Sequence, residues 1–123
     1  MSRTALVVDD SPTMRQMVAF TLTNAGFKVV EAEHGKDAVK KVSAGQKMDI
    51  VVTDLNMPEM DGISLIKELR KMAAFKFTPI LMLTTESAIE NKQAGKEAGA
   101  TGWIVKPFNP EVMLKIIAKV LPV

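Results

Sequence analysis

Cysteine is absent from this chain of 123 residues, and histidine occurs only once. Without cysteine there are no disulfide bonds, thiolate zinc sites or cysteine nucleophiles. The formal net charge is only +2, which excludes the dense positive field that a dedicated nucleic-acid binder uses to neutralise phosphates. The apolar runs are much too short to cross a bilayer. We therefore expect a protein of a reducing cytoplasm, with neither nucleic acid nor a membrane as its partner.

The amino terminus shows no cleavable signal segment, because Met-Ser-Arg-Thr leads directly into a strand-like run. A length of 123 residues fits one domain. Hydrophobic residues make up 47% and charged residues 24% of the chain, which is typical of an ordinary globular protein. We expect one core and no room for a separate catalytic or DNA-reading domain.

Short apolar runs alternate with stretches of helical periodicity. The runs at Ala5–Val8, Ile50–Val52, Ile80–Leu83 and Trp103–Val105 are rich in branched residues, which is typical of strands buried on both faces of a parallel sheet. A lysine interrupts the run at Phe27–Val30, so an edge strand is predicted there. No linker or repeat separates the strand–helix pairs, and the pattern predicts a single right-handed (βα)5 unit of the α/β class.

The expected helices carry recognisable start and stop signals. Ser11-Pro12 and Asn109-Pro110 each combine a capping side chain with proline at the first helical position. Glycine adopts the left-handed conformation that often ends a helix, so helices are expected to stop at Gly26, Gly45 and Gly99. The dipeptide Asp61-Gly62 predicts a turn before another helix, without a catalytic role.

Apolar residues at helical spacing predict which face of each helix is buried. The predicted inward positions are Met14, Val18, Leu22 and Ala25 in the first helix, Leu65, Ile66, Leu69 and Met72 in the third, and Met113, Ile116, Ile117 and Val120 in the last. Met17 and Met82 are also placed on core faces, where methionine fills irregular space. The helix expected from Ser87 to Ala98 has Ile89 as its only large apolar residue, so it is predicted to be the least firmly packed.

Polar residues stand where several predicted strands end. Asp9 and Asp10 follow the first strand, Asp54 the third, Thr84 the fourth and Lys106 the fifth. Each residue alone is more often a turn, packing or surface residue. If the strand order is 2-1-3-4-5, however, all of them lie at one edge of the sheet, where open α/β sheets hold their functional sites. The combination predicts one site at this edge.

Three neighbouring carboxylates need a positive partner, because like charges repel strongly in a partly desolvated site. Oxygen ligands without cysteine or a nearby histidine favour a hard cation such as Mg²⁺. Together with Lys106, Mg²⁺ balances the formal charge of the three carboxylates. A phosphoryl group at the metal would then have its oxygens near Lys106 and the Thr84 hydroxyl, an arrangement suited to phosphoryl transfer.

These motifs together resemble the signature of the response-regulator receiver family, and in particular its single-domain chemotaxis members. The resemblance rests on Asp9-Asp10, the run Thr53–Gly62, Thr84 and Lys106-Pro107-Phe108, and it extends from about Thr4 to Leu121. It implies a doubly wound, flavodoxin-like, five-stranded parallel sheet with the order 2-1-3-4-5. It also implies that residues 1–123 form a single receiver domain without an output domain.

The resemblance implies a role for each site residue. Asp54 would accept a phosphoryl group from a sensor histidine kinase or a small phosphodonor. Asp9 and Asp10 would hold Mg²⁺ together with Asp54 and the backbone carbonyl of Asn56. Lys106 would contact the phosphoryl oxygens. The chain would thus be a signalling phosphoacceptor that promotes its own phosphorylation and dephosphorylation, rather than an enzyme acting on a separate substrate.

The resemblance also implies how the signal is switched and timed. Thr84 would move to bind the phosphoryl oxygens, and Trp103 would swing inward after it; a plain core anchor is the alternative role for Trp103. Asn56 and Glu86 match the pair that sets how fast the acyl phosphate hydrolyses in the chemotaxis regulators, so a short-lived phosphoryl state is expected. The expected partner surface combines the fourth helix, the fifth strand and the last helix.

The expected downstream partner is a flagellar motor switch protein or a phosphatase, and the chain is expected to be a monomer. A single-domain phosphorelay intermediate or a phosphate sink is the nearest alternative. A Mg²⁺-dependent phosphatase of the haloacid-dehalogenase type is a distant one, because its motif needs Asp-x-Asp and Ser11 stands two places after Asp9. Asp9-Asp10 would repel a flavin phosphate, and no Gly-x-x-x-x-Gly-Lys motif is present for a P-loop.

Overall fold

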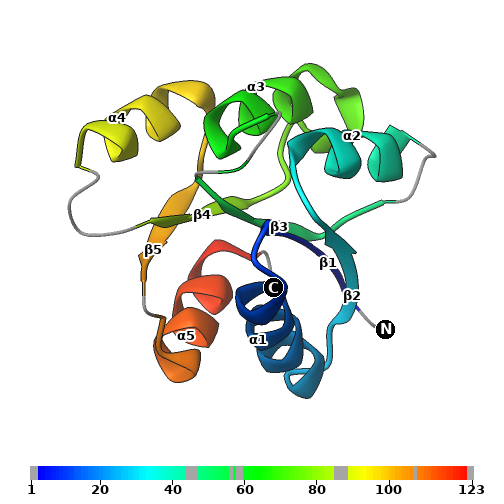
Figure 1. Cartoon of the computed structure of the whole chain (residues 1–123), viewed down its shortest axis with the longest axis vertical. Coiled ribbons are helices and arrows are strands. Elements are labelled where there is room, and N and C mark those ends of the chain that lie inside the picture. The colour runs from blue at the N-terminus through cyan, green and yellow to red at the C-terminus, as the bar shows by residue number, and fades with distance from the viewer. Residues whose placement is uncertain are drawn as a thin grey trace.

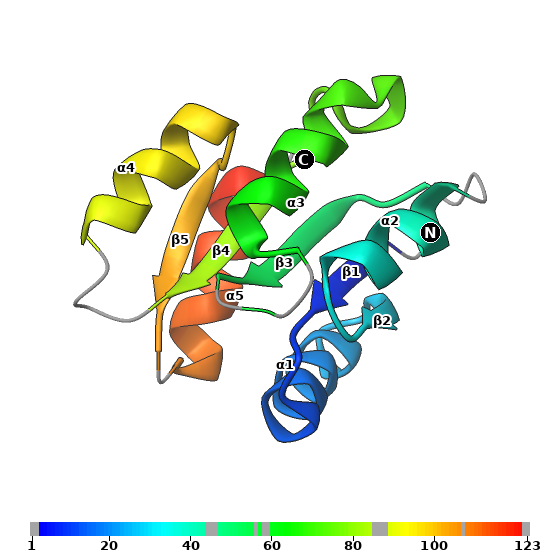
Figure 2. The ribbon, with the colours of Figure 1, turned by 45° about the horizontal axis from the view of Figure 1, so that its top comes forward.

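Five parallel strands form the centre of the molecule, in a computed structural model that describes residues 3–43, 47–55, 57, 60–84, 89–106 and 108–121. They are β1 (Thr4–Val8), β2 (Lys28–Ala32), β3 (Ile50–Asp54), β4 (Ile80–Thr84) and β5 (Gly102–Val105). Their order is β2-β1-β3-β4-β5, with every neighbouring pair parallel. The predicted order is therefore confirmed, and the carboxyl ends of all five strands lie on one side of the sheet, the side to which the arrowheads of β3, β4 and β5 point in Figure 2.

Helices cover both faces of this sheet. They are α1 (Pro12–Asn24), α2 (Gly35–Ser43), α3 (Gly62–Lys71), the short 3₁₀ helix η1 (Ala73–Phe75), α4 (Ile89–Ala98) and α5 (Pro110–Val120). Helices α1 and α5 lie against one face, and α2, α3 and α4 lie on the other (Figure 1). This three-layer arrangement is the doubly wound α/β fold that the sequence predicts. Among the described residues, no helix combines the length and the apolar character needed to cross a membrane.

The helix signals act as predicted where the structure describes them. The Ser11 hydroxyl accepts a hydrogen bond from the Met14 N–H at the start of α1, and the Asn109 side chain accepts two from the first turn of α5. Gly26 and Gly99 have φ values of +96° and +116° after α1 and α4. Gly45 lies outside the described residues. At the four described positions, local side-chain and backbone chemistry thus starts or ends the helix.

The sheet separates two hydrophobic clusters. One includes Leu6, Val51, Met82, Leu65, Ile66 and Leu69, on the side of α2 and α3. The other includes Val7, Val52, Leu83, Val18, Leu22 and Ile117, on the side of α1 and α5. Alternate residues of each strand thus enter opposite clusters, as the pleat of a strand requires.

Some boundaries and burial predictions are wrong. The edge strand β2 begins at Lys28 and ends at Ala32 rather than covering Phe27–Val30. Met17 is 50% exposed instead of lying on a core face, and Ala25 is an exposed capping residue after α1. Strand β5 is less buried than expected, with only Ile104 fully buried. Its position at the second edge of the sheet explains this exposure, because none of the five described strands covers its outer side.

The thin packing predicted for the fourth helix is confirmed in the part whose side chains are described, residues 93–98. Only Gly95 is buried there, whereas Ala94 and Ala98 are half-buried. A Cβ atom at Gly95 would lie 2.7 Å from Met82 Cε, so the helix backbone itself approaches the sheet closely. Within residues 93–98, such small contacts bury little apolar area.

Gly62, the first residue of α3, lies against the backbone at the end of β3. Its N–H donates to the Leu55 carbonyl at 2.8 Å, and a Cβ atom at this position would lie 2.3 Å from the Asp54 carbonyl oxygen. No side chain fits there unless the backbone of Asp54 moves. The glycine therefore has a steric role at the expected site, in addition to the turn role predicted from sequence.

The Gly62→Ala substitution is expected to lower the free energy of unfolding by about 3 kcal/mol, because a backbone atom cannot yield like a side chain. Gly26→Ala is the matched control. Gly26 has open space around its Cβ position and only a positive φ, which costs about 1 kcal/mol for alanine. Urea unfolding of both variants measures the two effects, and equal losses would contradict the steric role of Gly62.

Candidate functional site

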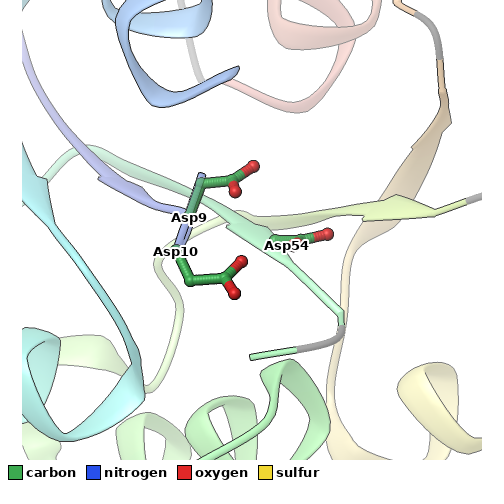
Figure 3. A group of neighbouring side chains, drawn as sticks. All are labelled: Asp9, Asp10 and Asp54. Carbon is green, nitrogen blue, oxygen red and sulfur yellow. The ribbon is translucent and has the colours of Figure 1, made fainter. Parts of the chain in front are cut away.

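Three carboxylates meet at the carboxyl edge of the sheet. Asp9 and Asp10 follow β1, and Asp54 is the last residue of β3. One carboxylate oxygen from each lies within 4.8 Å of the others, and Figure 3 shows the three side chains pointing to the same side. Asp9 is 1% and Asp54 7% exposed, whereas Asp10 is exposed. The predicted convergence of these residues is confirmed, with two buried acids and one that faces solvent.

Asp9 has one oxygen without a hydrogen-bond partner. Its Oδ1 accepts from the Ser11 N–H at 2.9 Å, and its own N–H donates to the Ala32 carbonyl at 3.1 Å. Its Oδ2 is buried and receives no hydrogen bond. A buried oxygen of this kind is costly unless something positive binds it. Asp9 Oδ2 belongs to a group of three acids that could hold a cation.

Lys106 supplies positive charge at the same place. Its Nζ lies 2.5 Å from Asp54 Oδ1 and 3.9 Å from Asp9 Oδ2. The Leu55 N–H also donates to Asp54 Oδ1, at 2.9 Å. One ammonium group thus contacts two buried carboxylates and offsets part of the repulsion among the three acids.

Thr84 and Trp103 lie on the neighbouring strands. Thr84 ends β4, is 2% exposed, and its carbonyl accepts from the Lys106 N–H at 2.6 Å. The structure therefore brings Thr84 and Lys106 to the same edge as the acids. Trp103 is half-buried in β5, in register with Met82, and packs against the cluster on the α2 and α3 side. Asn56 and Glu86 lie outside the described residues.

The donor set fits a hard divalent cation. All three candidate ligands are carboxylates, which Mg²⁺, Ca²⁺ and Mn²⁺ prefer over softer donors. Asp9 Oδ2 adds to this indication, because it is buried, accepts no hydrogen bond and has only the more distant Lys106 Nζ beside it, at 3.9 Å. Asp10 is the exposed member of the group.

Sequence reasoning missed two residues that shape this site. Gly62 allows α3 to begin directly against the Asp54 carbonyl, and its position beside Asp61 indicated only a turn. Arg15 of α1 donates to the carbonyl oxygen of Asp9 at 2.8 Å. An arginine in a helix is ordinarily a surface residue, so nothing in the sequence pattern distinguishes it.

Burial raises the pKa of Asp9 above its ordinary value and is the largest effect on it. The hydrogen bond from the Ser11 N–H and the charge of Lys106 lower this pKa, and the charge of Asp54 raises it. The net pKa is raised. Between the ordinary and the raised pKa, the folded state holds a proton that the unfolded state has released. The contribution of Asp9 to stability is therefore lost as pH rises through this window.

In metal-free protein at pH 7, Asp9→Asn is expected to raise the free energy of unfolding by about 1 kcal/mol, because an uncharged isostere removes this cost. The gain should shrink as pH falls through the window. Asp37→Asn is the control, because the pKa of Asp37 is shifted in the opposite direction. Burial raises the Asp37 pKa, but the hydrogen bond from the Glu33 N–H and the contact with Lys41 outweigh burial and lower the pKa overall. Urea unfolding with EDTA at several pH values measures both variants, and an Asp9→Asn protein less stable than wild type at pH 7 would contradict the expectation.

Comparisons with known proteins agree with this fold. The family model for the response regulator receiver domain matches residues 5–118. Chemotaxis protein CheY1 of Helicobacter pylori is 44% identical over 117 residues, which cover 94% of each chain. The chemotaxis protein CheY homolog of Campylobacter jejuni is 41% identical over 94% of this chain and 90% of its own length.

Solved structures show the same likeness. The chemotaxis response regulator CheY4 of Vibrio cholerae superposes with a TM-score of 0.92 and 49% identity, covering 98% of this chain and 100% of its own. A response regulator of Chloroflexus aurantiacus superposes with the same TM-score at 34% identity and covers 98% of both chains. With a family match along almost the whole sequence, close relatives of equal length and the acidic site at the predicted strand ends, this chain belongs to the response regulator receiver domain family.

Proposed function

We propose that the protein is a phosphorylation-controlled signalling switch of a chemotaxis two-component system, in which Asp54 is the phosphoacceptor. One observation carries this proposal: Lys106 Nζ lies 2.5 Å from Asp54 Oδ1, beside the buried Asp9 Oδ2, which accepts no hydrogen bond. A nucleophilic carboxylate, a lysine for the phosphoryl oxygens and a cation position are then in one place. The names of the Helicobacter, Campylobacter and Vibrio relatives support chemotaxis as the process.

Asp9, Asp10 and Asp54 would hold Mg²⁺, with the backbone carbonyl of Asn56 as a further ligand. When bound, Mg²⁺ supplies positive charge that attracts phosphoryl oxygens and offsets the repulsion of the three acids. The burial of Asp9 and Asp54 strengthens this attraction, since water screens charges less in a partly buried site.

Phosphoryl transfer then needs a free carboxylate oxygen on Asp54. Oδ1 accepts from Lys106 and from the Leu55 N–H, so Oδ2 is the oxygen that attacks. A bond forms between Oδ2 and phosphorus, the bond from phosphorus to the donor atom breaks, and the leaving group takes the electron pair. The donor is a histidine kinase or a small phosphodonor. Lys106 then moves its contact from Oδ1 to the new phosphoryl oxygens.

The phosphoryl group changes the protein at β4 and α4. It adds about one negative charge and new acceptor oxygens beside Thr84. A charge-assisted hydrogen bond from the Thr84 hydroxyl is worth about 1.5–3 kcal/mol, which shifts a two-state population by roughly ten- to a hundredfold. Helix α4 follows β4 in the chain and is thinly packed, so it is the element that such a change displaces most easily.

The output partner would bind the surface formed by α4, β5 and α5. A flagellar motor switch protein is the proposed target, with a phosphatase as a further partner, and the proposed location is the cytoplasm. The inward swing of Trp103 and the rate-setting roles of Asn56 and Glu86 remain predictions. Transfer to a second histidine protein, as in a phosphorelay, uses the same chemistry at Asp54.

Incubation with Mg²⁺ and acetyl phosphate tests the proposal, with intact-protein mass as the measurement. The protein is expected to gain one phosphoryl group, to lose it within minutes after the donor is removed, and to gain none in EDTA. Failure to gain a phosphoryl group with Mg²⁺ present would refute the function.

A further inference from the structure

The Arg15 guanidinium joins helix α1 to the backbone of Asp9 and to strand β2. Its Nη1 donates to the Asp9 carbonyl oxygen at 2.8 Å, and its Nε donates to Glu31 Oε1 at 3.2 Å. The Arg15 side chain is only 15% exposed, whereas that of Glu31 is 44% exposed. Most of the arginine is therefore held against the protein, next to the residue that carries the unpartnered oxygen.

The start of α1 aims this side chain at the site. The Arg15 N–H donates to the Ser11 carbonyl at 2.9 Å, closing the first turn of the helix. Long side chains in a helix lean toward its amino terminus, so the guanidinium extends back toward the segment that links β1 to α1. An arginine one turn later would reach the middle of α1 instead.

The Asp9 carbonyl belongs to the peptide group that connects Asp9 to Asp10. The Asp9 N–H is bound to the Ala32 carbonyl and the Asp9 carboxylate to the Ser11 N–H. These two bonds fix the Asp9 residue on either side, and the bond from Arg15 Nη1 to the Asp9 carbonyl oxygen is the contact made to the Asp9–Asp10 peptide group itself. The Asp10 Cα is attached directly to this peptide, so the orientation of the peptide sets where the exposed Asp10 side chain starts.

We propose that Arg15 is a positioning residue for the metal site, which orients the Asp9–Asp10 peptide so that both carboxylates face one cation. The inference rests on the magnesium site of the proposed function and adds a residue that acts through the backbone. Groups that orient metal ligands from behind typically affect metal affinity about 10- to 100-fold.

The sign of the effect separates positioning from simple electrostatics. Arg15 is a cation near three acids, so its removal by itself would strengthen the attraction of Mg²⁺. Loss of the bond to the Asp9 carbonyl would instead weaken binding, because the two carboxylates would no longer be held toward one point. A variant that binds Mg²⁺ more weakly therefore indicates positioning.

Calorimetric titration with Mg²⁺, without any phosphodonor, tests the inference on wild type, Arg15→Gln and Glu31→Gln. Arg15→Gln is expected to bind about tenfold more weakly than wild type. Glu31→Gln leaves the bond from Arg15 to the Asp9 carbonyl in place, so this variant is expected to bind Mg²⁺ nearly as wild type does. A Mg²⁺ affinity of Arg15→Gln equal to or above that of wild type would overturn the positioning role of Arg15 and leave the proposed metal site standing. Absence of Mg²⁺ binding by wild type would overturn the proposed metal site itself.

A second variant keeps the test decisive if Arg15→Gln does not fold. Arg15→Lys retains the charge, and its ammonium can reach one acceptor without the planar fork of arginine. We expect its Mg²⁺ affinity to lie below that of wild type and above that of Arg15→Gln. Urea unfolding of each metal-free variant establishes that it is folded, and an Arg15→Lys affinity at or above the wild-type value would contradict positioning.

Discussion

The Asp54→Asn variant is expected to gain no phosphoryl group from acetyl phosphate and Mg²⁺, whereas wild type gains one. The amide has nearly the shape of the carboxylate, and its oxygen can still accept from the Leu55 N–H that now contacts Asp54 Oδ1. It lacks the negative charge that makes the carboxylate a nucleophile and a metal ligand. The fold should therefore persist while the chemistry is lost, and intact-protein mass over time measures the loss.

Asp49→Asn is the matched control. Asp49 lies before β3, at the opposite end of this strand from Asp54, and its Oδ2 accepts from the Thr4 N–H at 2.7 Å. An amide oxygen can take over this bond, so the variant should be phosphorylated as wild type is. A phosphoryl gain by Asp54→Asn would place the acceptor elsewhere, and a loss in Asp49→Asn would mean that the assay responds to folding.

Without divalent cations, Lys106→Met is expected to lower the free energy of unfolding at pH 7 by about 3 kcal/mol. The substitution leaves Asp9 and Asp54 buried together without their ammonium partner, and breaking a buried ion pair typically costs about 3–5 kcal/mol. We expect the lower end, because the Lys106 side chain is 22% exposed. Excess Mg²⁺ should restore much of the loss, since the cation then neutralises the same carboxylates.

Lys71→Met provides the comparison for this experiment. Lys71 pairs with Glu68 at 3.2 Å in α3, but its side chain is 73% exposed, and exposed pairs contribute about 0–1 kcal/mol. Urea unfolding in EDTA and in Mg²⁺ measures both variants. A Lys106→Met protein that unfolds as wild type does, or that Mg²⁺ leaves unchanged, would contradict the role of Lys106 in neutralising the site.

Much of the fold is predictable because its signals are local. Branched apolar runs mark the buried strands, and Ser11 and Asn109 start helices by bonding to N–H groups only two or three residues away. Parallel strands joined by helices place all carboxyl ends at one edge. For this reason the meeting of Asp9 and Asp54, separated by most of two strand–helix pairs, follows from the pattern.

The errors arise where the pattern is ambiguous. Met17 lies at the border of the apolar stripe of α1, where a small rotation of the helix decides between core and solvent, and Ala25 is the capping residue after the helix has ended at Asn24. The ends of β2 depend on hydrogen bonds to β1, which pair Lys28 with Thr4 and Ala32 with Val8. Such pairing is a property of two strands together, and one strand's composition does not specify it.

Composition and spacing alone predict a one-domain α/β protein with a group of acids at one sheet edge, and the small net charge of +2 does not reveal that group. The tertiary structure decides which Asp9 oxygen accepts no hydrogen bond. It also sets the contact of Lys106 with Asp54 and the bond from Arg15 to the Asp9 carbonyl. These contacts depend on distances of about 3 Å between groups from different elements. Residue types and periodicity place side chains on a face or at a strand end. Only the packed backbone sets their separation, because register, helix rotation and the close approach at Gly62 act together.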